Sequence, residues 1–424
     1  MQQRIGYDLM KEAKPKKDKD IKEPKESKEM AQPEVNIGMI GHVDSGKTSL
    51  VKAITGVWTD THSEELKRGI SIRIGYADVD IYKCGKCKGN DAYAVEKTCP
   101  NCKGKSEYLR TVSFVDAPGH ETLMMTMLSG AIIMDGAILV IAANEECPQP
   151  QTIEHMAAIT INGVKNLIIA QNKVDLVSKE EALKNYKQIK DFLAKTPYKD
   201  AKIIPTTANQ RIDLSYLIDA IEKYIPSPKY SVDKPMKMFC VRSFDINKPG
   251  TKAKDMKGGI LGGSVIQGKL SIGDKVEILP GLENKKFLTE VRGISTSKGR
   301  IKTARAGGLL AIETALDPSI VGSDKLRGQI IAAPGLMGDP IKNIEFEFNQ
   351  LDRTLINEEY TLTINEQIVL VIGAMPTIAT IKNIKGKNIS CILNNAMVVE
   401  KGQKIAISKK KMLKWRLIGY GVVK

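Results

Sequence analysis

The sequence predicts an α/β domain built on a parallel sheet, followed by two units made of short β-strands. Residues 35 to about 228 alternate strand-like and helix-like segments, which is typical of a parallel sheet with flanking helices. From about residue 236, short β-rich runs alternate with glycine turns, a texture that favours closed β-barrels. Between the two textures, residues 225–228 read Ile-Pro-Ser-Pro and predict a linker.

A glycine-rich loop follows the first strand-like run. Residues 41–48 read Gly-His-Val-Asp-Ser-Gly-Lys-Thr, between a strand-like run at 35–40 and a helix-like run at 49–54. This fits the pattern G-x-x-x-x-G-K-[ST], in which backbone N–H groups converge on a phosphate. Lys47 adds positive charge toward the β- and γ-phosphates, and the Thr48 hydroxyl can ligate Mg²⁺. A chance glycine turn is disfavoured by the strand before it and the helix after it, so we predict a nucleoside triphosphate site.

Two further motifs stand at predicted strand ends. Asp116-x-x-Gly119 supplies a carboxylate for the Mg²⁺ shell and a glycine whose N–H can approach the γ-phosphate. Residues 172–175 read Asn-Lys-Val-Asp, where the acceptor-only carboxylate of Asp175 suits the N1–H and N2–H₂ donors of guanine. Asn172 would brace the loop and Lys173 would lie over the base. Each motif alone could be an ordinary strand-end turn, but their order along the chain predicts a guanine nucleotide.

The predicted nucleotide site joins all of these loops. The segment 203–208 is another strand-to-loop sequence, and we expect it to close the base pocket. The expected GTP-binding residues are Val43, Asp44, Ser45, Gly46, Lys47, Thr48, Ser49, Gly119, Asn172, Lys173, Asp175, Thr207, Ala208 and Asn209.

Four cysteines form two closely spaced pairs. Cys84-x₂-Cys87 and Cys99-x₂-Cys102 are separated by eleven residues, which matches a tetrahedral zinc site of four thiolates. Such a site is structural, because all four positions are filled by protein. The alternative is a surface loop with free thiols or disulfides. We predict a zinc insertion at about 82–106, and buried thiols in a reducing cytosol for the scattered Cys147, Cys240 and Cys391.

Charge points to a polyanionic partner. The chain carries 64 basic and 49 acidic residues, a net charge of +15. Residues 1–30 are highly charged and poor in apolar groups, so we expect disorder there, yet nine basic against seven acidic residues leave them only +2. The excess therefore lies in the folded body and favours RNA binding, although a generally basic proteome would have the same effect. No apolar run of about 18 residues and no signal-peptide core is present, which predicts a cytoplasmic protein without a membrane span.

These motifs resemble the translational GTPases of the elongation factor Tu class. The chain is more closely similar to the gamma subunits of archaeal and eukaryotic initiation factor 2, and the resemblance covers roughly residues 33–424. It implies an α/β P-loop GTPase domain with a zinc-knuckle insertion, followed by two β-barrel domains. The stretches that carry it are 41–44, 63–70, 116–121, 147–152, 242–250 and 415–421. The expected boundaries are 1–33 for a disordered charged extension, 34–228 for the GTP-binding domain, 234–340 for the second domain and 341–424 for the third.

The resemblance implies roles at matching positions. Thr48 and Ser71 would ligate Mg²⁺, although the family usually has Thr where this chain has Ser71. Asp44 and the carbonyl of Gly69 would hold a second Mg²⁺, as they do in relatives. His120 would position the attacking water, or would be a switch-loop residue with no direct catalytic part. The complete magnesium set is Asp44, Thr48, Gly69, Ser71 and Asp116, and Thr207 replaces the more usual Ser of the base-closing loop.

The implied function is GTP-dependent delivery of methionyl initiator tRNA to the small ribosomal subunit. GTP would order the switches at 69–71 and 116–120, and hydrolysis, slow unless partners stimulate it, would release the factor. Implied partners are the alpha and beta subunits of the same heterotrimeric factor, the small ribosomal subunit with its mRNA complex, and an exchange or activating factor. Tyr76 is either a contact near the aminoacyl end of the tRNA or a strand core residue.

Two other functions share the nucleotide motifs. An elongation-type carrier, including a selenocysteine-specific one, is disfavoured by the zinc insertion and by the ending Trp-Arg-Leu-Ile-Gly-Tyr-Gly at 415–421. A GTPase-like subunit of a metabolic enzyme, such as a sulfate-activating one, is disfavoured by the basic body.

Three local expectations complete the sequence-based interpretation. Residues 215–224 should form a helix and 265–276 a hairpin-like unit. The basic run at 409–416 either contacts tRNA phosphates or is a solvated strand edge, and we expect Trp415 in the core.

Overall fold

The computed structural model describes residues 32–59, 74–120, 123–210, 212, 214–248, 250–252, 256–283, 285–351, 360–411 and 414–424. The predicted disordered extension and the expected magnesium ligands Gly69 and Ser71 lie outside the described residues. None of the helices within these ranges combines the length and the apolar run needed to cross a membrane.

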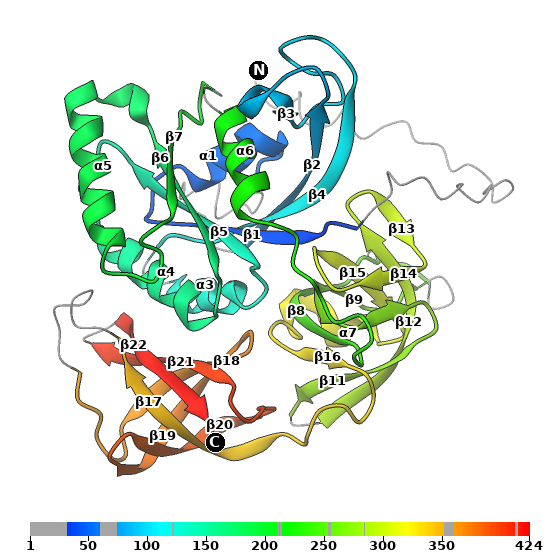
Figure 1. Cartoon of the computed structure of the whole chain (residues 1–424). Helices are drawn as coiled ribbons and strands as arrows, with labels where there is room; N and C mark the ends of the chain where they lie inside the picture. Colours follow the sequence, from blue (N-terminus) through cyan, green and yellow to red (C-terminus); the bar gives the residue numbers. More distant parts are fainter. Residues whose placement is uncertain are drawn as a thin grey trace, which may run out of the picture. The chain divides into compact units, whose positions relative to one another are not determined.

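The first domain contains a seven-stranded sheet in the order β3-β2-β4-β1-β5-β6-β7 (Figure 1). Strand β1 pairs in parallel with β4 and β5, and β5, β6 and β7 continue in parallel. β2 and β3 run antiparallel to their neighbours, so the expectation of a parallel sheet is correct only for β4 to β7 and β1. The reason is that the cysteine-containing insertion joins β2 to β4 as a hairpin rather than as a crossover helix. The strands are β1 (Val35–Ile40), β2 (Gly75–Cys84), β3 (Tyr93–Ala94), β4 (Ser106–Asp116), β5 (Gly136–Ala142), β6 (Asn166–Asn172) and β7 (Lys202–Pro205).

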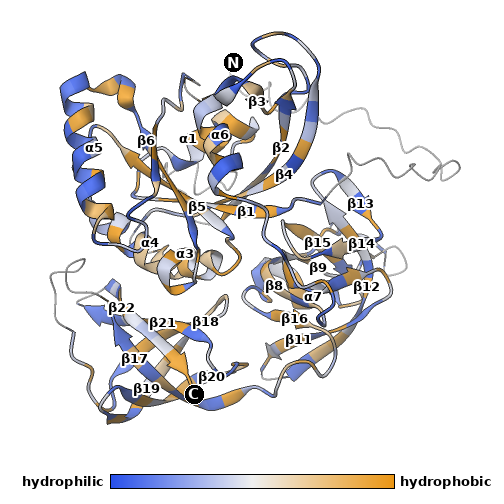
Figure 2. Ribbon diagram, in the orientation of Figure 1, coloured by the Kyte–Doolittle hydropathy of each residue, from blue (hydrophilic) through white to orange (hydrophobic). Residues whose placement is uncertain are grey.

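Helices cover both faces of this sheet. Side chains of β5 alternate between two core clusters, with Ile138 and Val140 in one and Leu139 in the other. The first cluster also takes residues of α1 and α6, and the second takes residues of α3, α4 and α5. Figure 2 shows the apolar central strands and the polar outer side of α5. The helices are α1 (Lys47–Thr55), α3 (Met124–Ala131), α4 (Pro150–Ile161), α5 (Lys179–Leu193) and α6 (Leu214–Tyr224), with short 3₁₀ turns η2 (Gly89–Ala92) and η4 (Val174–Leu176).

The second domain contains a ring of six strands. The order is β11-β16-β8-β9-β15-β12, and pairing of β11 with β12 closes it. The expected hairpin at 265–276 is wrong, because β9 pairs with β8 and β15, whereas β10 pairs with β14. The elements are β8 (Lys237–Phe244), β9 (Ile260–Gln267), β10 (Lys269–Ser271), β11 (Lys275–Leu282), β12 (Lys285–Thr296), β13 (Gly299–Ile301), β14 (Thr303–Arg305), β15 (Leu310–Thr314), β16 (Ile330–Ala332), α7 (Pro318–Val321) and the 3₁₀ turn η6 (Gly322–Asp324).

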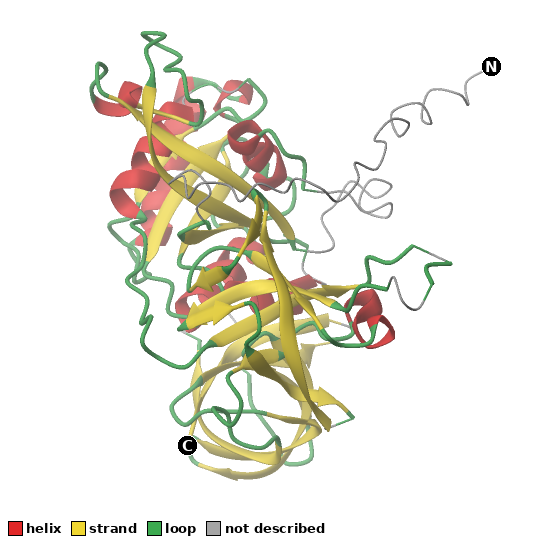
Figure 3. Ribbon diagram, turned by 90° about the vertical axis from the view of Figure 1, so that its right-hand side faces the viewer, coloured by secondary structure: helices red, strands yellow, loops and turns green. Residues whose placement is uncertain are grey.

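The third domain is a closed barrel in the order β17-β20-β19-β18-β21-β22. Figure 3 shows the strand-rich character of the two barrels, in contrast to the mixed helices and strands of the first domain. The strands of the third domain are β17 (Ile341–Gln350), β18 (Gln367–Ile372), β19 (Met375–Lys385), β20 (Asn388–Met397), β21 (Lys404–Lys411) and β22 (Lys414–Val423).

Strands β21 and β22 carry the basic run at 409–416. Trp415 pairs with Lys410 and is only half-buried, so the expectation of a core tryptophan is wrong. Lys409 forms an ion pair with Glu366 at 2.7 Å, whereas Lys410 is exposed. Of the three scattered cysteines, Cys240 and Cys391 are buried and Cys147 is half-buried.

Candidate guanine-nucleotide site and zinc centre

The phosphate loop connects the end of β1 to the start of α1. Gly41 and Gly46 adopt φ angles of +137° and +93°, which favour glycine, and Asp44 has φ 60°. α1 begins at Lys47, two residues before the helix-like run recognised in the sequence. Lys47 is 6% exposed, and its Nζ donates to the carbonyl oxygens of Gly41 at 3.1 Å and His42 at 2.7 Å. The loop is therefore held in a closed curl by its own lysine.

Hydroxyl and carboxylate oxygens meet at the start of α1. Thr48 Oγ1 donates to Asp116 Oδ2 at 2.7 Å, and Thr59 Oγ1 donates to the same oxygen at 2.6 Å. Asp116 ends β4 and is 1% exposed, so β1–β4 pairing brings it beside the loop. Oxygen donors are the ligands that Mg²⁺ prefers, and Thr48 and Asp116 fit such an ion. Asp44, the third described residue of the expected magnesium set, is exposed.

The Asp-x-x-Gly segment lies against the phosphate loop. A Cβ atom at Gly119 would come within 2.5 Å of Lys47 Nζ, 2.9 Å of Gly41 O and 2.9 Å of Val43 N. Only glycine allows this approach to the phosphate loop. His120, the next residue, is half-buried.

Asn172 links the predicted base-binding loop to the phosphate loop. Its Nδ2 donates to Ser45 O at 3.0 Å, and its Oδ1 accepts from Ala208 N at 3.2 Å and from Thr206 Oγ1 at 3.4 Å. The side chain is 2% exposed, and a Cβ at Gly46 would lie 2.2 Å from its Nδ2. One amide group thus joins three loops that are far apart in sequence.

The remaining predicted residues surround this link. Lys173 follows Asn172 in a left-handed conformation with φ 61°, which turns the chain into η4 and leaves the Asp175 side chain exposed. Thr207 is 3% exposed, whereas Asn209 faces solvent. Val43 and Ser49 lie half-buried on the loop and in the first turn of α1.

The four paired cysteines converge. Their sulfur atoms all lie within 4.8 Å of one another, with 3.4 Å between Cys84 and Cys102 and 3.7 Å between Cys87 and Cys99. A zinc ion about 2.3 Å from four sulfurs would set them about 3.8 Å apart, so the cluster fits tetrahedral zinc. The backbone amides of Lys86 and Cys87 lower the pKa of the Cys84 thiol, whereas the neighbouring Cys102 thiol raises the pKa of Cys87, so the cluster favours a thiolate at Cys84.

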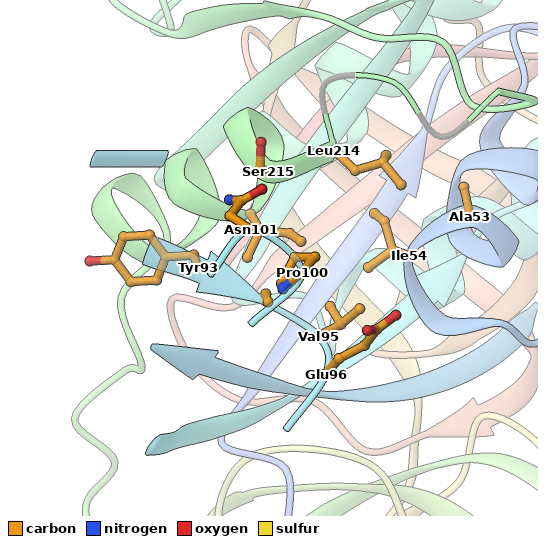
Figure 4. A pocket seen from close by; sticks show the side chains of 11 residues that line it. Ala53, Ile54, Tyr93, Val95, Glu96, Pro100, Asn101, Leu214 and Ser215 are labelled. Carbon is orange, nitrogen blue, oxygen red and sulfur yellow. The ribbon is translucent and has the colours of Figure 1, made fainter. Parts of the chain in front are cut away.

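The insertion also packs on the helices behind the nucleotide loops. A cavity of about 290 Å³ lies between the insertion, α1 and α6. Figure 4 shows Pro100 of the insertion between Asn101 on one side and Ile54 of α1 and Leu214 of α6 on the other, and Tyr93 pointing away from them. This cavity is distinct from the predicted nucleotide site. It lies beside Ala53 and Ile54 near the end of α1, whereas the phosphate loop joins α1 at its first residue, Lys47.

A larger groove is lined by the first and second domains. Its volume is about 520 Å³, and it is lined by Tyr76 and Val57 on one side and by Arg242, Phe244 and Leu309 on the other. The Tyr76 hydroxyl is buried and has no hydrogen-bond partner within the described residues. Burial raises the pKa of Tyr76, so the hydroxyl remains a donor.

Two polar residues of the site were not predicted. Thr59 contacts Asp116 but belongs to no motif, and the only signal was its position after α1. His155 lies on α4, and its Nδ1 accepts a hydrogen bond from Gly41 N at 2.9 Å. A histidine at helical spacing among apolar residues gives no sequence signal for such a contact.

Family models match both ends of the chain. Residues 32–227 match the elongation factor Tu GTP binding domain, and residues 342–423 match initiation factor eIF2 gamma, C terminal. Together with the two closed barrels, these matches confirm the predicted fold class.

Curated relatives extend the similarity over nearly the full length. Translation initiation factor 2 subunit gamma of Methanosarcina mazei is 49% identical over 410 residues, which are 93% of this chain and 94% of that protein. The same subunit of Methanococcus vannielii is 48% identical, with coverage of 92% and 98%. That of Archaeoglobus fulgidus is 46% identical, with coverage of 93% and 96%.

Solved structures of elongation factors share the fold. A bacterial selenocysteine-specific elongation factor superposes with a TM-score of 0.72 at 25% identity, covering 92% of this chain and 58% of that one. Translation elongation factor SelB from Methanococcus maripaludis, in complex with the GTP analogue GppNHp, gives 0.70 at 22% identity, covering 93% of this chain and 79% of that one. The latter likeness shows the fold alone.

Proposed function

Because the chain belongs to the gamma subunits of translation initiation factor 2, a family of GTPases, we propose that it carries methionyl initiator tRNA to the small ribosomal subunit. GTP binding would close the switch segments on the phosphate loop, and hydrolysis of GTP to GDP and phosphate would drive release. The observation that carries the proposal is 46–49% identity to curated gamma subunits over more than nine-tenths of the chain.

The groove beside Tyr76 supports a site for the aminoacyl end of the tRNA. Its apolar lining, with Val57, Phe244 and Leu309, suits a methionine side chain, and its volume of about 520 Å³ lies in the range of small-ligand sites. The unpartnered Tyr76 hydroxyl supplies a hydrogen-bond donor inside it. Strand β2 carries Tyr76 and runs antiparallel to β4, so the groove and Asp116 share one pair of strands.

The nucleotide and metal assignments form part of the proposal. Asn172 and the phosphate loop would hold GTP, Thr48 and Asp116 would hold Mg²⁺, and His120 would position the attacking water. Mg²⁺ would neutralise charge on the phosphates, and zinc on the four cysteines would stabilise the insertion. We retain Asp44, Gly69 and Ser71 as magnesium ligands in this proposal.

The wider setting follows from the family. We propose a cytoplasmic heterotrimer with alpha and beta subunits that acts on the small ribosomal subunit and its mRNA complex. The proposed division of the chain is an extension at 1–33, the GTP-binding domain at 34–228 and barrels at 234–340 and 341–424.

The test is tRNA binding by the purified chain together with its alpha subunit. Affinity would be measured for aminoacylated initiator and elongator tRNA, each with a GTP analogue and with GDP. Tight binding only for the initiator and only with the GTP analogue is the expected result. Tyr76→Phe should weaken it, whereas the control Tyr216→Phe, on the exposed side of α6, should not.

Two outcomes would contradict the proposal. Equal binding of elongator tRNA would favour the elongation-type alternative, which the lower identity to selenocysteine-specific factors now disfavours. No tRNA binding in either nucleotide state, with GDP still bound, would exclude a tRNA carrier.

A further inference from the structure

His155 lies beneath the phosphate loop although it belongs to none of the nucleotide-binding motifs. It is on α4, between Glu154 and Met156, and is 1% exposed. Its Nδ1 accepts the backbone N–H of Gly41 at 2.9 Å. The bond joins residues 114 positions apart in the chain.

The bond requires one particular form of the imidazole ring. Nδ1 can accept only if it carries no proton, so the ring must be neutral with its hydrogen on Nε2. Burial and the nearby positive charge of Lys47 lower the pKa of His155 to about 3. The ring therefore stays neutral at neutral pH, and the acceptor is permanently available.

Gly41 has little freedom of its own. Its φ of +137° excludes most other residues, and a Cβ there would lie 2.3 Å from Val140 O. Its carbonyl oxygen accepts from Lys47 Nζ at 3.1 Å. His155 thus holds the N–H of Gly41 while the phosphate-binding lysine holds its C=O, and the N–H points to α4 rather than toward a phosphate.

The position of Gly41 also sets the clearance for the Asp-x-x-Gly segment. A Cβ at Gly119 would meet Gly41 O at 2.9 Å, so the two segments are already in close contact. Any shift of the Gly41 peptide would change both this contact and the direction of the loop amides that follow it.

We propose that His155 is a positioning residue for the phosphate loop: its neutral imidazole fixes the Gly41 peptide and thereby pre-organises the loop for the nucleotide phosphates. The role concerns the phosphates and not the base, because His155 bonds to Gly41 at the start of the phosphate loop, whereas the amide of Asn172 bonds to Ser45 and to the 206–208 segment. Losing the bond should therefore weaken the binding of GDP much more than the binding of guanosine.

The experiment compares His155→Leu with His155→Asn in the full chain. Leucine fills a similar space without an acceptor, and asparagine places Oδ1 at the position of Nδ1. We expect His155→Leu to weaken GDP binding roughly 10- to 100-fold, since a buried donor would be left unpaired. His155→Asn should stay within about threefold of the original chain. The control Ile159→Val trims a fully buried side chain of the same helix without touching the loop, and it should leave GDP affinity unchanged.

Three results would overturn the proposal. The first is an unchanged GDP affinity in His155→Leu. The second is an equal loss of affinity for GDP and for guanosine in that variant. The third is a loss of GDP affinity in His155→Asn as large as that in His155→Leu. If His155→Leu does not fold, nitrogen NMR of the unsubstituted chain still tests the proposal, because it reports the tautomer of the His155 imidazole. A proton on Nδ1 in the folded protein would refute the bond, and a proton on Nε2 would support it.

Discussion

Replacing Asn172 by alanine should uncouple the three loops that we propose hold the guanine nucleotide. The amide makes bonds of 3.0 Å to Ser45 O and 3.2 Å from Ala208 N, and a longer one of 3.4 Å from Thr206 Oγ1. At about 1 kcal/mol for each of the two shorter bonds the loss is about 2 kcal/mol, and it rises to about 4 kcal/mol if their buried partners stay unpaired. Because nucleotide binding needs all three loops in place, GDP affinity should fall roughly 30- to 700-fold.

Asn185 offers a matched control for that substitution. It is 3% exposed, and its amide donates to Glu145 O at 2.8 Å and accepts from Gln171 Nε2 at 2.9 Å. Asn185→Ala should therefore lower the free energy of unfolding by a similar amount, but it should leave the phosphate loop in place. Urea unfolding without nucleotide measures the free energy of unfolding, and calorimetric titration with GDP measures the affinity for GDP.

The comparison separates a local role from general destabilisation. We expect both variants to lose stability and only Asn172→Ala to lose GDP affinity. An equal loss of GDP affinity in the two variants would refute the reasoning, and so would an Asn172→Ala variant that binds GDP within threefold of the original chain.

Further substitutions and conditions test other parts of the site. Cys99→Ser should lower bound zinc and the melting temperature while leaving GDP affinity within a few-fold, as metal analysis and calorimetry would show. Gly119→Ala should weaken a GTP analogue more than GDP, because its Cβ would come within 2.5 Å of Lys47 Nζ, and nucleotide competition would detect this. His155 has a folded pKa of about 3, below its unfolded value of 6.5, so the unfolded chain binds the extra proton between these values. The contribution of neutral His155 to the free energy of unfolding is thus fully present above pH 6.5, and it falls by ~1.4 kcal/mol per pH unit as pH falls toward 3. When unfolding is followed against pH, this slope should be smaller in His155→Asn. Arg110→Met should cost about 3–5 kcal/mol in urea unfolding, because Arg110 is 6% exposed and forms a 2.8 Å ion pair with Glu222, which would be left uncompensated.

Local features of the site could be predicted because they depend on neighbouring residues. The glycine-rich segment 41–48, with a strand before it and a helix after it, is expected to place backbone amides around a phosphate whatever surrounds them. The convergence of the four cysteines followed from spacing for the same reason, since two short turns bring each cysteine pair together. The strand ends carrying Asp116 and Asn172 were predictable for a different reason, because parallel pairing puts the carboxyl ends of the strands at one edge of the sheet.

The sequence by itself thus determined the nucleotide class, the family and the succession of one α/β domain and two barrels. Only the tertiary structure decided that β2 runs antiparallel to β4, that β10 pairs with β14 and that Trp415 lies half-buried. It also placed His155 under Gly41, a contact between residues 114 positions apart. Such pairings depend on which apolar faces pack together across the whole chain, and period and spacing describe only the side chains within a few residues of one another.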